Sequence, residues 1–158
     1  MATYSFLDNM CSIQGPNGAF SMGAGACNSE GGITVVMIED KSTMTIGADG
    51  CVMHSLHAGK GATITVRLLK TSPTNALLSQ MYGRDTVQSQ NHGQNTISIR
   101  DMARNDVVVA QQCAFAKFAD LTYAKEGGEM VWTFHAGICD FVLGSGLAQA
   151  TGIAAPAA

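Results

Sequence analysis

The sequence predicts a mainly β fold with one helix, and three observations carry this prediction. Eighteen of the 158 residues are glycine, and turn signals recur along the chain. Between the turns lie short segments rich in β-branched residues, several of which alternate apolar and polar side chains as half-buried strands do. A single stretch, residues 73–82, has helical spacing instead. The length suits one domain, so residues 1–158 are treated as a single unit.

The first part of the chain predicts a hairpin and a buried strand. Residues 4–14 form the first predicted strand, and Asn17-Gly18 turns the chain because both positions tolerate positive φ, so that residues 19–22 return alongside. Residues 23–32 are polar and glycine-rich, which indicates a connection with little to bury. Residues 33–38 are apolar on both faces, as in a doubly buried strand.

Alternation is clearer further along the chain. The predicted strands there are residues 63–68, 96–100, 106–112, 130–135 and 138–143. Met130, Trp132 and Phe134 share one face of their strand and are expected in the core. We expect a turn at Ala136-Gly137, so that the last strand returns beside the one before it.

The predicted helix has a start signal and a stop signal. Ser72 offers an N-cap, and Pro73 suits the first helical position because its missing N–H would have no partner there. Gly83 supplies the stop. The apolar stripe of this helix is Ala76, Leu77 and Met81, with Leu78 or Tyr82. We expect that stripe to pack on the sheet.

Residues 39–60 do not have the pattern of strands that pack in a hydrophobic core. Asp49-Gly50 marks a hairpin tip between two short arms. The large apolar residues of these arms are Met44, Ile46, Val52, Met53 and Leu56. Apolar residues on a protruding arm need a partner to cover them, so we interpret this hairpin as a contact arm. Residues 144–158 form a Gly- and Ala-rich tail with little bulk, which is expected to be loosely ordered. The alternative is that this tail lies on a neighbouring copy.

The composition favours an assembly. Only 13% of the residues are charged, about half the average, which suggests that much of the surface faces other protein. The nine basic residues are scattered, so no basic stripe is available to grip nucleic acid. No apolar run is long enough to cross a membrane, and the N-terminus does not resemble a secretion signal. If copies close into a ring, the polar strand faces could line a water-filled channel; their residues are Thr63, Thr65, Arg67, Thr96, Ser98 and Arg100.

Catalytic chemistry finds little support in the sequence. The five cysteines have no short pairing, and we interpret them as reduced thiols in the structural role of small hydrophobes. The alternative is a cysteine nucleophile at Cys51 activated by His54, which lies close in sequence. No metal site is predicted, since His54 and His57 fall on opposite faces of an extended segment.

Several blocks of the sequence are similar to a known family. The most specific are Glu39-Asp40-Lys41, residues 43–50 (TMTIGADG), 52–60 (VMHSLHAGK) and 65–73 (TVRLLKTSP). Further matches are residues 97–101 (ISIRD), 114–117 (AFAK), 120–125 (DLTYAK) and Trp132 with Ala136-Gly137. Together they resemble the tail tube proteins of contractile-tailed bacteriophages, over residues 4–143. The tube protein of type VI secretion is similar in architecture.

The resemblance implies a fold and an assembly. Two antiparallel sheets would pack as a sandwich or small barrel, flanked by one helix. Six copies would form a ring whose strands join into one inner barrel, and the rings would stack into a hollow tube. The hairpin would contact the adjacent ring through Met44, Ile46, Asp49, Gly50, Val52, Met53 and Leu56.

The resemblance also implies partners and a location. The tube would sit in the virion tail inside a contractile sheath, after assembly in the host bacterial cytoplasm. Its partners would be further copies, the sheath, tape measure, baseplate and neck proteins, with no cofactor, no enzymatic turnover and no membrane. DNA would pass without specific binding, because an acidic wall repels phosphates. The candidate lumen acids are Glu39, Asp40 and Asp49. The alternative is a baseplate or neck ring that starts or ends the tube.

Overall fold

The computed structural model describes residues 3–144. A short 3-10 turn, η1 (Phe6–Asp8), precedes the first strand. The strands are β1 (Asn9–Gly15), β2 (Gly18–Ser21), β3 (Asn28–Met37), β4 (Ser42–Ile46), β5 (Val52–Leu56), β6 (Ala62–Leu69), β7 (Asn95–Asp101), β8 (Asp106–Lys117) and β9 (Glu129–Val142). The single α-helix of the described residues, α1 (Thr74–Asp85), lies between β6 and β7.

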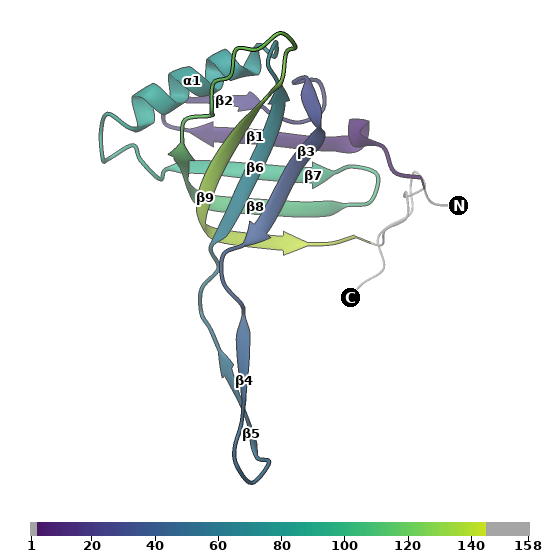
Figure 1. Ribbon diagram of the computed structural model, residues 1–158, viewed down its shortest axis with the longest axis vertical. Coiled ribbons are helices and arrows are strands. Elements are labelled where there is room, and N and C mark those ends of the chain that lie inside the picture. The colour runs from purple at the N-terminus through teal and green to yellow at the C-terminus, as the bar shows by residue number, and fades with distance from the viewer. Residues whose placement is uncertain (1–2, 145–158) are drawn as a thin grey trace.

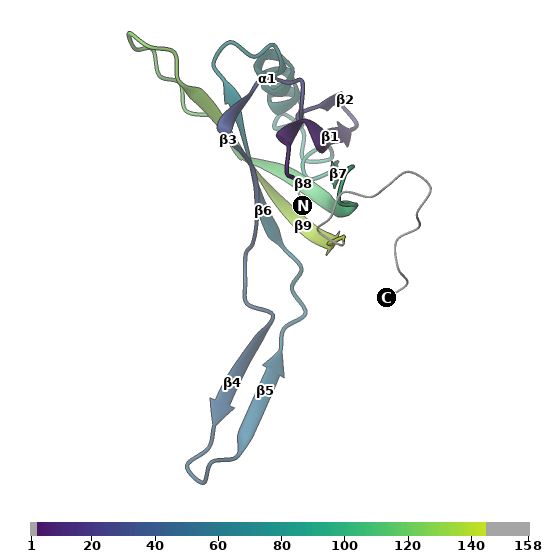
Figure 2. The same cartoon turned by 90° about the vertical axis from the view of Figure 1, so that its right-hand side faces the viewer.

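The strands form a curled sheet with a separate protruding hairpin (Figure 1). Seven strands pair in the order β2-β1-β7-β8-β9-β6-β3, and β4 pairs only with β5. The curl folds the large sheet over itself, so that two layers face each other across the core (Figures 1 and 2). The mainly β fold with two packed layers, one helix and a long hairpin is therefore confirmed. The two layers belong to one continuous sheet.

Strand β9 makes the corner between the layers. Its first half pairs with β6 up to Ala136, and its second half continues along β8 as far as Val142. The expected turn at Ala136-Gly137 is wrong: the chain bends there and stays in one strand. At this bend the Gln112 side chain lies close over Gly137, where a β-carbon would lie 2.7 Å from Oε1 and 3.1 Å from Cβ of Gln112. Gln112 itself has a positive φ of 55°, which marks an irregularity in β8 at the same corner.

The core is built by the alternation that the sequence shows. Ile64, Val66 and Leu68 of β6 are fully buried, as are Trp132 and Phe134 of β9. Burying a large apolar side chain contributes about 1.5–3 kcal/mol. The indole Nε1 of Trp132 also donates a hydrogen bond to Oδ1 of Asn75, at 3.0 Å, which ties the helix to the sheet.

The helix differs in three details from the prediction. It extends beyond Gly83 to Asp85, because the glycine keeps a helical conformation there. The helix begins at Thr74 with Pro73 at the cap position, one residue later than predicted, and the Ser72 hydroxyl accepts a hydrogen bond from the Thr74 amide at 3.2 Å. The predicted stripe is rotated: Leu78 and Met81 are buried, whereas Ala76 and Leu77 are exposed.

Asp85 closes the helix onto the sheet through a buried polar network. Its carboxylate accepts a hydrogen bond from the Asn95 side chain at 2.7 Å and another from Asn17 at 2.5 Å. Asp85 and Asn95 are almost fully buried. The carboxylate therefore joins the β1–β2 turn, the helix end and the start of β7.

Three predictions in the first part of the chain are corrected. Residues 4–8 are not part of the first strand, because Ser5 caps η1 with its hydroxyl. The glycine-rich connection is shorter than expected, since β3 begins at Asn28. β3 is also not doubly buried: it lies at the edge of the sheet, and Val36 is 57% exposed.

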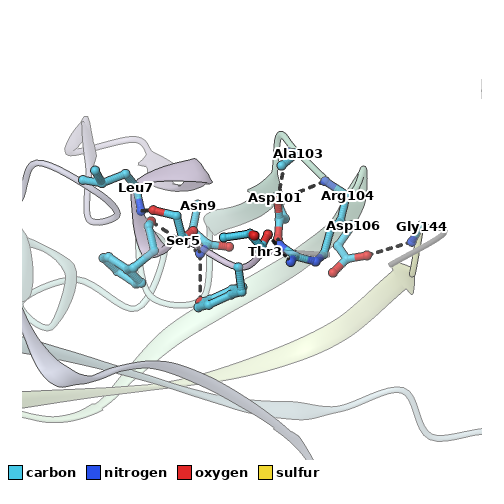
Figure 3. A network of polar contacts seen from close by, with 11 residues as sticks. Thr3, Ser5, Leu7, Asn9, Asp101, Ala103, Arg104, Asp106 and Gly144 are labelled. Atoms are coloured by element: carbon cyan, nitrogen blue, oxygen red, sulfur yellow. Dashed lines mark hydrogen bonds and ion pairs between the residues drawn. The ribbon is translucent and has the colours of Figure 1, made fainter. Parts of the chain in front are cut away.

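A polar network holds both ends of the described chain against the β7–β8 turn (Figure 3). The Arg104 guanidinium donates to the Thr3 carbonyl at 2.6 Å and contacts the Asp101 carboxylate. The Gly144 amide donates to Asp106 at 2.7 Å. Apart from Gly144, the Gly- and Ala-rich tail lies outside the described residues. The described part of the chain contains no helix long and apolar enough to span a membrane.

Candidate assembly surface

The β4–β5 hairpin extends away from the body of the molecule (Figure 2). The two strands pair in a regular antiparallel register from Ser42 opposite Leu56 to Ile46 opposite Val52. At the root, the His57 amide donates to the Lys41 carbonyl at 2.8 Å. The hairpin is thus an ordered two-stranded ribbon that adds nothing to the hydrophobic core of the sheet.

The hairpin tip is held by a small set of hydrogen bonds. The Gly47 amide donates to the Cys51 carbonyl at 2.7 Å, and the Gly50 amide donates to the Gly47 carbonyl at 2.9 Å. Gly50 has a φ of 89°, as the sequence predicts for this turn. Asp49 accepts a hydrogen bond from the Cys51 amide, which lowers the pKa of this exposed carboxyl. The tip therefore carries a negative charge at neutral pH.

The two faces of the hairpin differ in chemistry. Side chains directly opposite each other in a ribbon lie on the same face. Met44 faces His54 and Ile46 faces Val52, whereas Thr45 faces Met53 on the other side. The first face carries Met44, Ile46, Val52, Leu56, Ser42 and His54, and the second carries Thr43, Thr45, Met53 and Ser55. We call the first the apolar face of the hairpin.

All five large apolar residues of the arm are more than half exposed, and four of them share the apolar face. Met53 is the exception. It follows Val52 directly in β5, so its side chain lies on the opposite face of the hairpin, beside Thr45. Such a continuous apolar strip on an isolated subunit is typical of a surface that another protein covers.

The root of the hairpin brings acidic residues against the body. A pocket of about 480 Å³ is lined there by Met37, Glu39, Asp40, Lys41, Gly59, Lys60, Cys139, Asp140 and Phe141. The Glu39 carboxylate lies over Gly59, so a side chain at position 59 would displace it. Lys60 forms an exposed ion pair with Asp140 at 3.3 Å. Of the predicted lumen acids, Glu39 and Asp40 lie together at the root, and Asp49 lies apart at the tip.

The cysteines fall into two groups. Cys11, Cys113 and Cys139 are buried, as expected of structural thiols. Burial raises the pKa of Cys11 to about 12 and that of Cys113 to about 11. Cys27 and Cys51 are exposed, so the expectation of a buried role is wrong for these two. Both lie in segments that connect strands.

The structure does not favour the predicted alternative of a nucleophile at Cys51. The thiol donates to Oδ2 of Asp49 at 3.3 Å. His54 points to the apolar face opposite Met44. Within residues 3–144, no group of three or more potential ligands is placed to hold a metal ion.

The comparisons with known proteins decide the family. The family profile described as bacteriophage PhiTE tail tube protein matches residues 1–144. The chain belongs to this tail tube family. Membership indicates a structural component of a bacteriophage tail. No curated protein matches the sequence.

One solved structure supports the fold of this tail tube family member. The tube-terminating cap of the anti-feeding prophage aligns with a TM-score of 0.57 at 10% identity, over 90% of this chain and 94% of the cap chain. A chain of the anti-feeding prophage baseplate aligns with a TM-score of 0.49 at 9% identity, over 90% of this chain and 95% of that one. The cap therefore shares the fold of the tail tube chain.

Sequence reasoning missed two features of the surface. The division of the hairpin into two faces could have been predicted from the sequence, because strand alternation on either side of the Asp49-Gly50 tip separates Met53 from the other apolar residues. The free edges of the sheet could not, because they depend on which strands pair.

Proposed function

We propose that this protein forms the tail tube itself: hexameric rings stack into a hollow tube that conducts DNA inside a contractile sheath. The observation that carries the proposal is the apolar face of the hairpin, which projects from the body with four large apolar side chains uncovered. Membership of the tail tube family supplies the context.

The position of the hairpin favours stacking. It leaves the body at one end, while α1 and the loop between β8 and β9 lie at the opposite end (Figure 1). A contact between two different surfaces of the same chain repeats without limit when it does not close on itself. Hairpins that reach from each ring to the next would therefore build a tube. Met44, Ile46, Val52 and Leu56 are the proposed contact residues, with Asp49 and Gly50 shaping the tip and Met53 at the margin.

The charge of the chain suits a conduit for DNA. Each copy adds a net charge of −3. A basic wall would bind DNA because its side chains displace counterions from the phosphates, whereas a neutral or acidic wall does not and lets a duplex slide. Glu39, Asp40 and Asp49 are the proposed lumen acids. A surface potential of the assembled tube with a strongly basic bore would overturn this part of the proposal.

The proposed partners follow from this role. The tube would contact further copies, the sheath, the tape measure protein, and the baseplate and neck proteins at its two ends. It would be assembled in the host bacterial cytoplasm and remain in the virion tail. The work would be mechanical, through contacts between rings.

Negative-stain electron microscopy of the purified protein over a concentration series tests the proposal. Long hollow tubes of uniform width are the expected result. Discrete rings at every concentration would favour a baseplate or neck protein that starts or ends the tube. Monomers throughout would overturn the assembly, and the reactivity of Cys51 would then be measured for the enzymatic alternative.

A further inference from the structure

One ionisable side chain lies in the middle of the apolar face of the hairpin. His54 of β5 is directly opposite Met44 of β4. The pair Ile46 and Val52 lies on its tip side, and Leu56 lies on its root side. Every other residue of this face is apolar or a serine. His54 is therefore the only side chain on the apolar face whose charge changes near neutral pH.

The charged groups of the hairpin lie at its ends or on its other face. Asp49 is at the tip, where its carboxylate accepts hydrogen bonds from the amide and the thiol of Cys51. The second histidine, His57, is at the root, and its Nε2 lies 3.5 Å from Oγ1 of Thr43 on the opposite face. β4 is the strand that pairs with β5, and it presents Ser42, Met44 and Ile46 to the apolar face, none of which titrates.

Covering the apolar face would treat the two forms of this imidazole differently. In the isolated subunit His54 is exposed, so water can solvate the neutral and the protonated ring alike. Inside a contact with another subunit the ring would lie among apolar side chains. Burying a charge in such surroundings costs much more than burying a neutral polar group. The covered state therefore favours the neutral imidazole.

We infer that the protonation of His54 controls the hairpin contact between rings: the neutral imidazole is buried in the contact, and protonation releases it. The inference rests on the proposed stacking and adds its regulation by pH. The regulatory ligand is a proton, and acid weakens the contact.

The size of the effect follows from proton linkage. A subunit whose imidazole is protonated in solution must lose that proton when its hairpin is covered. The association constant per subunit then falls by about tenfold for each pH unit below the range in which imidazole titrates. Each subunit has one hairpin, so the concentration of subunits left unassembled beside tubes should rise by the same factor.

Sedimentation of tubes over a pH series tests the inference. The full-length protein is assembled at steps from pH 8 to pH 5, a range that lies above the ordinary pKa of carboxyl groups. The protein left in the supernatant is then measured. For the wild type its concentration should be nearly constant from pH 8 to pH 7 and rise by about tenfold between pH 6 and pH 5. His54→Met, which matches Met44 across the ribbon, should remove this rise.

The other histidines provide matched controls. His57→Gln alters the root on the opposite face, His92→Gln the connection between α1 and β7, and His135→Gln the body at β9. Each should keep the rise of the wild type. His54→Gln is a second test variant, because its amide stays neutral and polar. It should also give a flat profile, even if methionine at position 54 prevents assembly.

The possible outcomes separate the inference from the proposed function. Tubes whose supernatant concentration stays flat in the wild type, or rises equally in His54→Met and His54→Gln, would overturn the inference while the proposed function stands. Stronger assembly of the wild type in acid would show that a carboxylate of the neighbouring subunit meets His54, which also overturns it. Absence of tubes from the wild type at every pH would overturn the proposed function, and the inference with it.

Discussion

Ile46 lies directly opposite Val52 across the hairpin, on the face that also carries Met44 and Leu56. All four side chains are more than half exposed. The hairpin contributes no residue to the core of the sheet, so its apolar face is free to serve a contact with another copy.

This arrangement predicts that the two faces respond differently to charge. Ile46→Asp should abolish or strongly shorten tubes, because burying an unpaired carboxylate in a contact is costly. Thr45→Asp, on the neighbouring position of the opposite face, is the matched control and should leave tubes near normal length. Tube lengths from electron micrographs provide the measurement. Equal loss in both variants would contradict a one-sided contact.

The hairpin substitution should leave the subunit intact. We expect Ile46→Asp to change the free energy of unfolding by no more than about 0.5 kcal/mol, as for surface sites. Urea denaturation of dissociated subunits would check this.

Gly50 at the tip predicts a defect of shape. Its φ of 89° is strained for a branched side chain, although a β-carbon would meet no neighbouring atom. Gly50→Val should therefore distort the tip and impair stacking more than folding. Gly50→Asn is the control, because asparagine tolerates positive φ. Normal tubes from Gly50→Val would show that the tip has no role in the contact.

The β9 corner predicts a defect of folding. A β-carbon at Gly137 would push the exposed Gln112 side chain from its position, so Gly137→Val should destabilise the subunit by about 0.5–1.5 kcal/mol, as a side chain forced off its rotamer does. Gln112→Gly in the same chain should recover part of the loss, since it removes the facing side chain and relieves a positive φ. Gly127→Val, where the space is open, is the comparison. Thermal unfolding of Gly137→Val, of the double variant, of Gly127→Val and of the wild type measures these differences in stability.

The stability of the subunit should depend on the chemical group at position 85 more than on its size. Asp85→Ala leaves the Asn17 and Asn95 amides without their acceptor, which should cost about 1–3 kcal/mol. Asp85→Asn keeps the shape but presents an amide to two donors, so it should also destabilise. Denaturant midpoints would show this, and an unchanged midpoint in both variants would mean that the network is dispensable.

The cysteines predict both a labelling pattern and a pH dependence. Cys27 and Cys51 should react quickly with a maleimide in the folded subunit, and the three buried thiols only after unfolding. The pKa of Cys11 is raised from 9.0 to about 12 and that of Cys113 to about 11, so the unfolded chain loses these protons first as the pH rises. Stability should accordingly fall as the pH increases above 9. The Cys27→Ser, Cys51→Ser variant should show the same fall, because the exposed thiols do not cause it.

The sequence predicted elements whose signals are local. Ile64, Val66 and Leu68 alternate with polar residues and are buried, and Asp49-Gly50 forms the tip of the hairpin. Ala136-Gly137 was misread because a glycine in an apolar segment suggests a turn. Its actual cause is the close approach of Gln112 from a strand 25 positions earlier, which only the pairing reveals.

The candidate assembly surface was also predicted only in part, because some of its features depend on local sequence and others on how the strands pair. The five large apolar residues of the hairpin were identified because a short protruding segment rarely carries so many, and all five are exposed. The apolar stripe of α1 was predicted correctly at Met81 and Leu78 and wrongly at Ala76 and Leu77. Leu77 and Leu78 fit helical spacing equally well, and only the position of the sheet selects Leu78. The edge position of β3 depends on the strand order, so its apolar residues suggested burial that the fold does not provide.

A helical reconstruction of assembled tubes by cryo-electron microscopy tests the central claim most directly. The account predicts that Met44, Ile46, Val52 and Leu56 of each hairpin are covered by a subunit of the next ring, while Thr43 and Thr45 stay in contact with water. A hairpin folded back on its own subunit, or left free between rings that touch elsewhere, would contradict it.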